Sequence, residues 1–274
     1  MKVLNLLLLL IFAPTVVAED AIATYLANEG VLITHGEAAI AFDPVFNNTY
    51  GRYELVPESM VEALFEGDAP FTDLDAVFIS HYHGDHFSAV DISTLLKKRP
   101  ELKLYAPEQA VKAMHSMSFI EDIRDRIVSI SLEVGDQPLH FQESGFDIGV
   151  SRIPHSGWPE RMTNIENLAF RVTLGSSATV LHLGDADTKD HHYEPHSAYW
   201  AERSIDLAMP PYWYFSSKNG QYVLENRLKP TTAVGIHVPE SISDNPDERP
   251  EELKGRKLFT RPGEKLVFSH SHPD

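Results

Sequence analysis

The chain has 274 residues, of which 43% are hydrophobic, and this is enough to bury a sizeable core within one domain. Its formal net charge is −17, from 23 basic and 40 acidic residues, so its surface repels phosphate backbones and has no electrostatic footprint for nucleic acid. The absence of cysteine excludes disulfides, cysteine-ligated metal and a lipoprotein anchor.

Residues 1–18 have the layout of a cleavable secretory signal. Lys2 gives a short basic start, residues 3–12 are almost unbroken apolar, and small or modest side chains lead up to Ala18, where a signal peptidase would cut. An uncleaved membrane anchor is the alternative, but the apolar run is shorter than the roughly 20 residues that a span needs. We therefore expect a signal peptide at 1–18, one mature domain at 19–274 without a stable membrane span, and a secreted location, most simply a bacterial periplasm.

After residue 18, short apolar runs alternate with helical patterns, which indicates an α/β chain. Ser88 is a suitable N-cap for a helix that runs to about Lys98, and Pro107 opens the next helix. A further short helical stretch is expected within 210–229. In chain order, the predicted strands are 31–34, 38–42, 76–80, 102–105, 146–153, 168–174, 179–183, 205–209, 232–236 and 266–269.

Four candidate metal ligands follow directly after the predicted strand 76–80. They are His81, His83, Asp85 and His86. Residues two apart in an extended segment project to the same side, so His81 and His83 can hold one ion together. Gly84 permits a sharp turn, after which Asp85 and His86 can face a second ion. Imidazole and carboxylate suit zinc and neighbouring divalent metals, and a merely histidine-rich surface turn is the weaker alternative for this ordered set.

The order His-x-His-x-Asp-His resembles the signature of the metallo-β-lactamase superfamily. Three later predicted strand ends match the same family in its order, because His155, Asp185 and His237 each follow an apolar run. The resemblance implies an α/β fold of four layers, an αββα sandwich in which two mixed sheets are flanked by helices.

The resemblance also implies a complete two-metal site. One ion would be held by His81, His83 and His155, the other by Asp85, His86 and His237, and Asp185 would bridge both. The ions would be divalent, most simply Zn²⁺, with Mn²⁺ or Fe²⁺ as alternatives. With Asp85 and Asp185 as its catalytic carboxylates, such a site uses a metal-bridging hydroxide to cleave an ester, lactone, amide or phosphodiester bond.

Two other functions stay open at this point. One is a non-catalytic metal-binding or sensing protein that retains the fold, although a merely structural site is normally closed and mononuclear. The other is a true β-lactamase, but Asp43-Pro44 resembles the branch of ascorbate-phosphate lactonases and N-acyl-phosphatidylethanolamine phospholipases. The expected partner is a small-molecule or lipid-like substrate rather than nucleic acid, and the oligomeric state is left open.

Aromatic residues are the candidate substrate contacts. Four of them stand in a row at 212–215, and four consecutive aromatics cannot all face one core. We predict that Trp158, Tyr212 and Trp213 form an apolar wall of the cleft, with packing of these loops onto the sheets as an equally good alternative. Among the remaining histidines, His182 is expected to pack near the site, whereas His35 and the group at 191–196 are expected in solvated turns.

Overall fold

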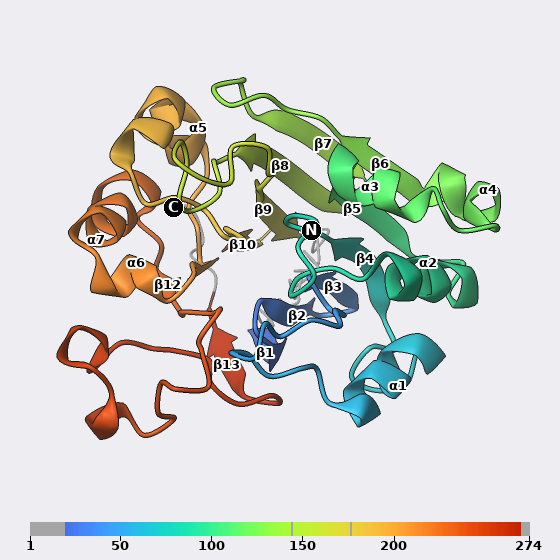
Figure 1. Cartoon of the computed structure of the whole chain (residues 1–274), viewed down its shortest axis with the longest axis horizontal. Helices are drawn as coiled ribbons and strands as arrows, with labels where there is room; N and C mark the ends of the chain where they lie inside the picture. The colour runs from blue at the N-terminus through green and yellow to red at the C-terminus, as the bar shows by residue number, and fades with distance from the viewer. Residues whose placement is uncertain (1–19, 144, 176, 270–274) are drawn as a thin grey trace, which may run out of the picture.

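In the computed structural model, which describes residues 20–143, 145–175 and 177–269, two β-sheets lie face to face between two layers of helices (Figure 1). The first sheet has the strand order β13-β1-β2-β3-β4-β5-β6, and the second has the order β12-β11-β10-β9-β8-β7. Each sheet contains both parallel and antiparallel pairs. The predicted αββα sandwich of two mixed sheets is therefore confirmed.

The strands are short, with two to seven residues each. Those of the first sheet are β1 Ala21–Ala27, β2 Gly30–His35, β3 Ala38–Phe42, β4 Leu74–Phe78, β5 Lys103–Pro107, β6 Ile127–Ile130 and β13 Lys265–Phe268. Those of the second sheet are β7 Leu139–Glu143, β8 Phe146–Arg152, β9 Leu168–Leu174, β10 Ala178–His182, β11 Leu207–Met209 and β12 Thr232–Ala233.

The helices form two groups, one on the outer face of each sheet (Figure 1). Covering the first sheet are α1 Glu58–Glu66, α2 Ala89–Lys98, α3 Glu108–Met114 and α4 Ile120–Ile123. Covering the second are α5 Ser197–Glu202, α6 Trp213–Ser216 and α7 Lys218–Val223, which continues into a π-helical turn at Leu224–Leu228. Short 3₁₀ turns lie at Arg124–Arg126, Asp190–His192, Glu194–His196, Pro246–Glu248 and Glu251–Leu253.

Three clusters of buried apolar side chains fill the spaces between the four layers. The central cluster lies between the sheets and includes Phe42, Phe78 and Phe170, whose rings pack on one another. The other two fill the space between each sheet and its helices. Because both faces of each sheet are covered, strands such as β3 are continuously apolar rather than alternating, which is why short apolar runs marked them in the sequence.

Most predicted elements are found within one or two residues of their expected bounds. The hairpin at 31–42 forms, with His35 paired to Ala38 across the turn. Helix α2 runs from Ala89 to Lys98, and the Ser88 hydroxyl accepts the Asp91 N–H as its N-cap. The predicted strand 232–236 is shorter, because its ladder with β11 includes only Thr232 and Ala233.

Within the described ranges, no helix combines the length and the apolar character that a membrane span requires. The predicted signal peptide at 1–18 lies outside the described residues, so it stays a prediction.

Candidate metal centre

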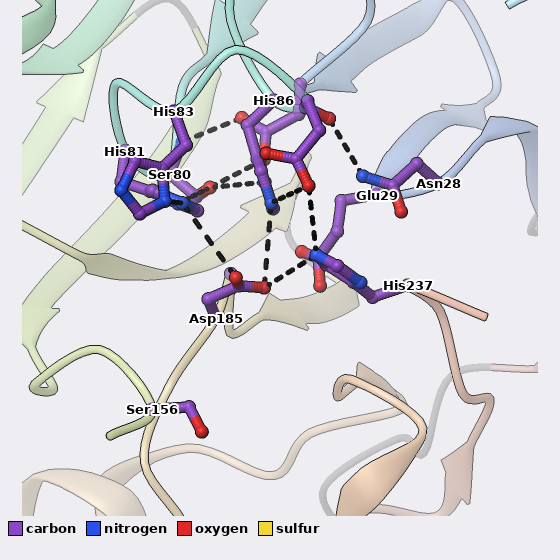
Figure 2. Close-up of polar contacts among 12 residues, drawn as sticks. Asn28, Glu29, Ser80, His81, His83, His86, Ser156, Asp185 and His237 are labelled. Carbon is purple, nitrogen blue, oxygen red and sulfur yellow. Dashed lines mark hydrogen bonds and ion pairs between the residues drawn. The ribbon is translucent and has the colours of Figure 1, made fainter. Parts of the chain in front are cut away.

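The seven predicted ligands come from four segments that follow strands of both sheets. His81, His83, Asp85 and His86 follow β4, His155 follows β8, Asp185 follows β10 and His237 follows β12. These strand ends meet at one edge of the sandwich, where side chains from different segments converge (Figure 2). The structure brings all seven side chains together, as the sequence predicted.

Just after strand β4, the backbone hydrogen-bonds to a side chain instead of to a neighbouring strand. The Ser80 N–H donates to Asp43 Oδ1 at 2.7 Å instead of continuing the ladder. The chain turns sharply after His83, as predicted, because the N–H groups of His86 and Phe87 both donate to the His83 carbonyl oxygen, although Gly84 itself has no left-handed φ. A Cβ on Gly84 would stand 3.0 Å from the Cβ of Asn48, so glycine is needed there for the close approach of a neighbouring loop.

Asn167 joins two of the ligand segments. Its amide nitrogen donates to the carbonyl oxygens of Ile153 and Leu183, both at 3.1 Å, and its Oδ1 accepts the Asp185 N–H at 2.9 Å. The side chain is fully buried, so each of these hydrogen bonds is shielded from water. Asn167 therefore fixes the backbone of Asp185 relative to the segment that carries His155, a role that nothing in its sequence context indicated.

Gly184, directly before Asp185, has a left-handed φ of 53°. A Cβ there would stand 2.5 Å from Asn167 Oδ1 and 2.7 Å from Ser80 Cβ. We therefore expect Gly184→Ala to lower the free energy of unfolding by about 2–4 kcal/mol, from backbone strain and overpacking together, as measured by urea titration. The matched control is Gly175→Ala, which has a similar φ of 60° and nothing within 4 Å of the added Cβ. An equal loss in both variants would show that the contacts of Gly184 do not matter.

The donor atoms form two groups that meet at Asp185. In the first group, ligand atoms of His81, His83, His155 and Asp185 all lie within 4.8 Å of one another, and the second group joins Asp85, His86 and His237. Asp185 Oδ2 is 3.1 Å from His155 Nε2 and 4.0 Å from His81 Nε2. Asp185 Oδ1 is 3.1 Å from His237 Nε2 and 3.6 Å from His86 Nε2. One carboxylate oxygen thus faces each group.

Several of these donor atoms are buried and have no hydrogen-bond partner in the protein. They include the Nε2 atoms of His86, His155 and His237 and the Oδ1 atom of Asp185. Leaving buried polar atoms unpaired costs free energy, so such a cluster needs a compensating ligand. Nitrogen and carboxylate oxygen in two adjoining groups are the donors that divalent metals take. The residues therefore fit the divalent ions that the fold implies.

Neighbouring groups orient the histidines for this task. Asp43 is fully buried, and its Oδ2 lies 2.9 Å from Nδ1 of His86 and accepts the Ser80 hydroxyl at 2.5 Å. His155 donates its Nδ1–H to the carbonyl oxygen of Ser156 at 2.9 Å. With Nδ1 protonated, Nε2 of each ring keeps its lone pair and faces the centre, which is the usual way that a protein prepares a histidine ligand.

Charges in the centre are strongly coupled. Burial lowers the pKa of His81 well below its ordinary value and that of His83 to about 4, so both rings are neutral near pH 7. Burial opposes ionisation of Asp185, but the imidazoles of His237 and His86 outweigh it and hold the pKa of Asp185 well below its usual range. Burial likewise disfavours a charged His237, yet Asp185 raises the pKa of that ring well above its ordinary value. A metal ion bound at Nε2 of His237 would therefore have to displace a proton from that ring.

The three predicted substrate contacts differ in their positions. The Trp213 ring stands 5.3 Å from the His237 ring, and its buried Nε1 has no hydrogen-bond partner. Tyr212 contacts Trp213 at 5.7 Å, and both are half-buried. Trp158 packs instead on His192 at 5.2 Å. Tyr53, which sequence reasoning missed, places its ring edge-on to His237 at 4.3 Å. Trp213 and Tyr53 are thus the aromatics whose rings pack on His237.

The other two residues of the aromatic segment are buried, and so are several histidines. Tyr214 and Phe215 are buried in the cluster over the second sheet. His182 is buried near the site, as expected. The expectation of a solvated turn was wrong for His192 and His196, which are buried because α5 and α7 enclose their loop, and His35 is half-buried with Nε2 3.0 Å from the Ser177 hydroxyl.

The tip of the β1–β2 hairpin also enters the centre, and nothing in the sequence analysis had indicated it. Asn28 donates its side-chain N–H to the carbonyl oxygen of Asp85 at 2.8 Å, and its own carbonyl accepts the His237 N–H at 2.8 Å. Glu29 follows it and is fully buried. Burial, with Asp185 close by, raises the pKa of Glu29 well above its ordinary value. Ligand atoms of Glu29, His86 and Asp185 lie within 4.8 Å of one another.

Comparison with known families shows which family this chain belongs to. The family described as "Beta-lactamase superfamily domain" matches residues 38–221, which is more than half of the chain. The chain belongs to the beta-lactamase superfamily. The matched range contains six of the seven predicted ligands, and His237 lies beyond it. The predicted family and enzyme class, a metal-dependent hydrolase of this superfamily, are thus confirmed.

Several proteins with solved structures are similar to this chain in fold but distant in sequence. The YhfI protein of Bacillus subtilis is 19% identical, with a TM-score of 0.56 over 91% of this chain and 99% of that one. A possible metal-dependent hydrolase from Veillonella parvula is 13% identical, with a TM-score of 0.60 over 91% and 100%. Human tRNase Z, short form, is 12% identical, with a TM-score of 0.56 over 89% and 98%.

Among curated proteins, ribonuclease Z of Thermoplasma acidophilum is 28% identical over 88 residues. That match spans 31% of this chain and 24% of the relative. The similarity is therefore local, and it is carried by only about a quarter of that enzyme's length.

Proposed function

We propose that this protein is a two-metal hydrolase that cleaves an ester, lactone, amide or phosphodiester bond in a small or lipid-like substrate. The observation that carries the proposal is the position of Asp185, whose two oxygens each face one group of histidine donors. The first ion would be held by His81, His83 and His155, and the second by Asp85, His86 and His237, with Asp185 between them. Zn²⁺ is the proposed metal, with Mn²⁺ or Fe²⁺ as alternatives.

When two dications are bound, they supply Lewis acidity and a water-derived nucleophile at neutral pH. The chain's own residues prepare the centre for this chemistry. Asp43 and the Ser156 carbonyl orient the rings of His86 and His155, so little reorganisation is needed during the reaction. No serine or cysteine nucleophile is required. Trp213 and Tyr53 cover one side of His237 and reduce the access of bulk water to it.

The charge of the chain supports a small substrate over a nucleic acid. A net charge of −17 opposes the approach of a polyanion, although the local similarity to a ribonuclease makes a phosphodiester the second candidate bond. A substrate panel of chromogenic lactones, esters, phosphodiesters and β-lactams, with a structured RNA as a further arm, tests this. Turnover of one small-molecule class by the metal-loaded protein supports the proposal. Cleavage of RNA alone, or of nothing, contradicts it.

Trp213 offers a test of the apolar wall. We expect Trp213→Ala to raise KM roughly fivefold, because an aromatic contact with the substrate is worth about 1 kcal/mol, while the melting temperature changes little for a half-buried ring. The matched control is Trp200→Ala, because the Trp200 side chain is buried in the core. We expect this variant to lose about 3–5 kcal/mol of stability and to keep a normal KM. A Trp213 variant that is strongly destabilised and has normal KM would contradict the wall.

Export is proposed from the sequence alone. A cleaved signal at 1–18 would leave a mature chain of 19–274 in a secreted or periplasmic location, where a domain without cysteine is stabilised by its core and its metals. N-terminal sequencing of the protein from the exported fraction checks this. A start at or near residue 19 is expected, and a chain that begins at Met1 in the cytoplasm would overturn it.

A further inference from the structure

Glu29 is a buried acid at a place where a turn would ordinarily be exposed. It is the second residue of the two-residue turn between β1 and β2, and such turns usually carry solvated Asn or Gly. Here its side chain is 0% exposed, and neither carboxylate oxygen has a hydrogen-bond partner in the protein. An isolated buried carboxylate is among the most costly groups in a protein interior, so something must compensate it.

His182 does not provide that compensation as a cation. Its Nε2 lies 3.3 Å from Glu29 Oε2 and donates its hydrogen to the Glu29 carbonyl oxygen at 3.0 Å. Its Nδ1 accepts the Gly184 N–H at 3.2 Å, so that nitrogen carries no proton. His182 is therefore a neutral ring. A neutral Glu29 would not resolve the problem either, because its hydroxyl would also lack an acceptor.

The carboxylate of Glu29 faces the centre from the hairpin side. Its ligand atom shares a 4.8 Å group with His86 and Asp185, whose Nε2 and Oδ1 atoms are themselves unpaired. Figure 2 shows the Glu29 side chain beside His237, across the centre from His81 and His83. Four carboxylates are buried around the centre, those of Glu29, Asp43, Asp85 and Asp185. When all four are ionised, as two bound dications would favour, their negative charge equals the positive charge of those ions.

From this geometry we infer that Glu29 is an additional carboxylate ligand on the side of the second ion, next to His86 and Asp185. The inference rests on the proposed two-metal function and deepens it. An added carboxylate oxygen makes the donor set of the second position harder in the hard–soft sense of metal ligands. Such a donor set favours ions such as Mn²⁺ or Fe²⁺ more than a set of imidazoles does. The second position would then differ from the first in metal preference, because the first has three histidines and only one carboxylate oxygen.

The experiment compares the wild-type protein with Glu29→Gln, which keeps the shape of the side chain and removes its charge. Metal content is measured after loading and desalting, and the affinity of each ion by competition with a chelator, for Zn²⁺ and Mn²⁺ separately. We expect Glu29→Gln to bind the first ion normally and the second about 10–100-fold more weakly, with the larger loss for Mn²⁺. Glu252→Gln, which removes the same charge from an exposed position, should change neither affinity.

Thermal unfolding with chelator gives a second readout that does not depend on activity. If Glu29 is uncompensated without metal, metal-free Glu29→Gln should melt higher than the metal-free wild type and gain less when metal is added. A lower melting temperature of the metal-free variant would indicate a structural partner and overturn the inference. So would unchanged affinity for the second ion in Glu29→Gln. If the wild type itself binds no second ion, the proposed function fails first, and the two failures are thereby distinguished.

Discussion

Replacing Asp185 by asparagine should leave at most one ion per chain and lower kcat/KM about 10³-fold. Asparagine has the same shape, but only one of its two terminal atoms can bind a cation. One group of histidines would therefore face an amide NH₂ where Asp185 now presents an oxygen, at 3.1 Å from His155 on one side and from His237 on the other. Losing the charge of one ion would raise the free energy of the transition state by several kcal/mol. Each 1.36 kcal/mol is a tenfold change in rate.

The matched control for this prediction is Asp187→Asn. Asp187 lies on the same loop and is also buried, but its Oδ1 accepts the Lys189 N–H and it faces His192 rather than the centre. We expect this variant to keep two ions and most of its turnover. Two ions and full turnover in Asp185→Asn would contradict the bridging role, and equal losses in both variants would indicate damage to the loop as a whole.

The second large effect is expected at Asp43, which contacts the predicted ligand His86. Its Oδ2 holds Nδ1 of His86 at 2.9 Å, and its Oδ1 accepts the Ser80 N–H. Asp43→Asn should weaken binding of the second ion about 10–100-fold and leave the first ion bound. Residues that orient a metal ligand typically contribute that much affinity. Asp43 has a left-handed φ of 40°, a conformation that asparagine also adopts, so the substitution isolates the charge.

Asp75→Asn is the control for Asp43. This exposed carboxylate also accepts a backbone N–H of the first sheet, that of Ala39, but it has no contact with a ligand. Chelator competition on both variants separates the two positions. If Asp43→Asn binds both ions as tightly as the wild type, the proposed support of His86 is wrong.

The set of candidate ligands could be proposed from the sequence because its information is local. His81, His83, Asp85 and His86 stand together in the sequence, and each later ligand follows directly after an apolar run that forms a strand or a bridge in the sheet. Strand ends of an α/β sandwich gather at one edge, so order and spacing were enough to place the donors. The same reasoning gave the hairpin at 31–42 and helix α2, whose turn and cap residues act on their immediate neighbours.

What could not be predicted depends on contacts between distant segments. Asn28 and Glu29 form a polar turn that would ordinarily be solvated, and they are buried because the segment of His237, much later in the chain, folds over them. Asn167 has no motif around it, and its role arises from three loops that meet at its side chain. Strand β1 was also missed, because its alanine-rich sequence fits a helix equally well until β2 and β13 pair with it.

The backbone at the centre also shows what tertiary structure imposes. His237 adopts a left-handed φ of 57°, which is uncommon for a residue with a side chain. The hydrogen bond from its N–H to the Asn28 carbonyl holds it there, and the ring is thereby directed at Asp185. No local signal in Gly235-Ile236-His237 predicts that conformation. His237 was predicted as a ligand from the sequence, whereas the strained backbone that positions it is visible only in the folded chain.

We propose that two divalent ions occupy this centre and sustain hydrolysis. Elemental analysis of the wild-type protein after loading with Zn²⁺ or Mn²⁺ and desalting, with turnover measured on the same sample, tests this most directly. We predict two ions per chain, and loss of turnover when a chelator removes them. Fewer than one ion per chain after careful loading, or turnover that persists in fully metal-free protein, would contradict it.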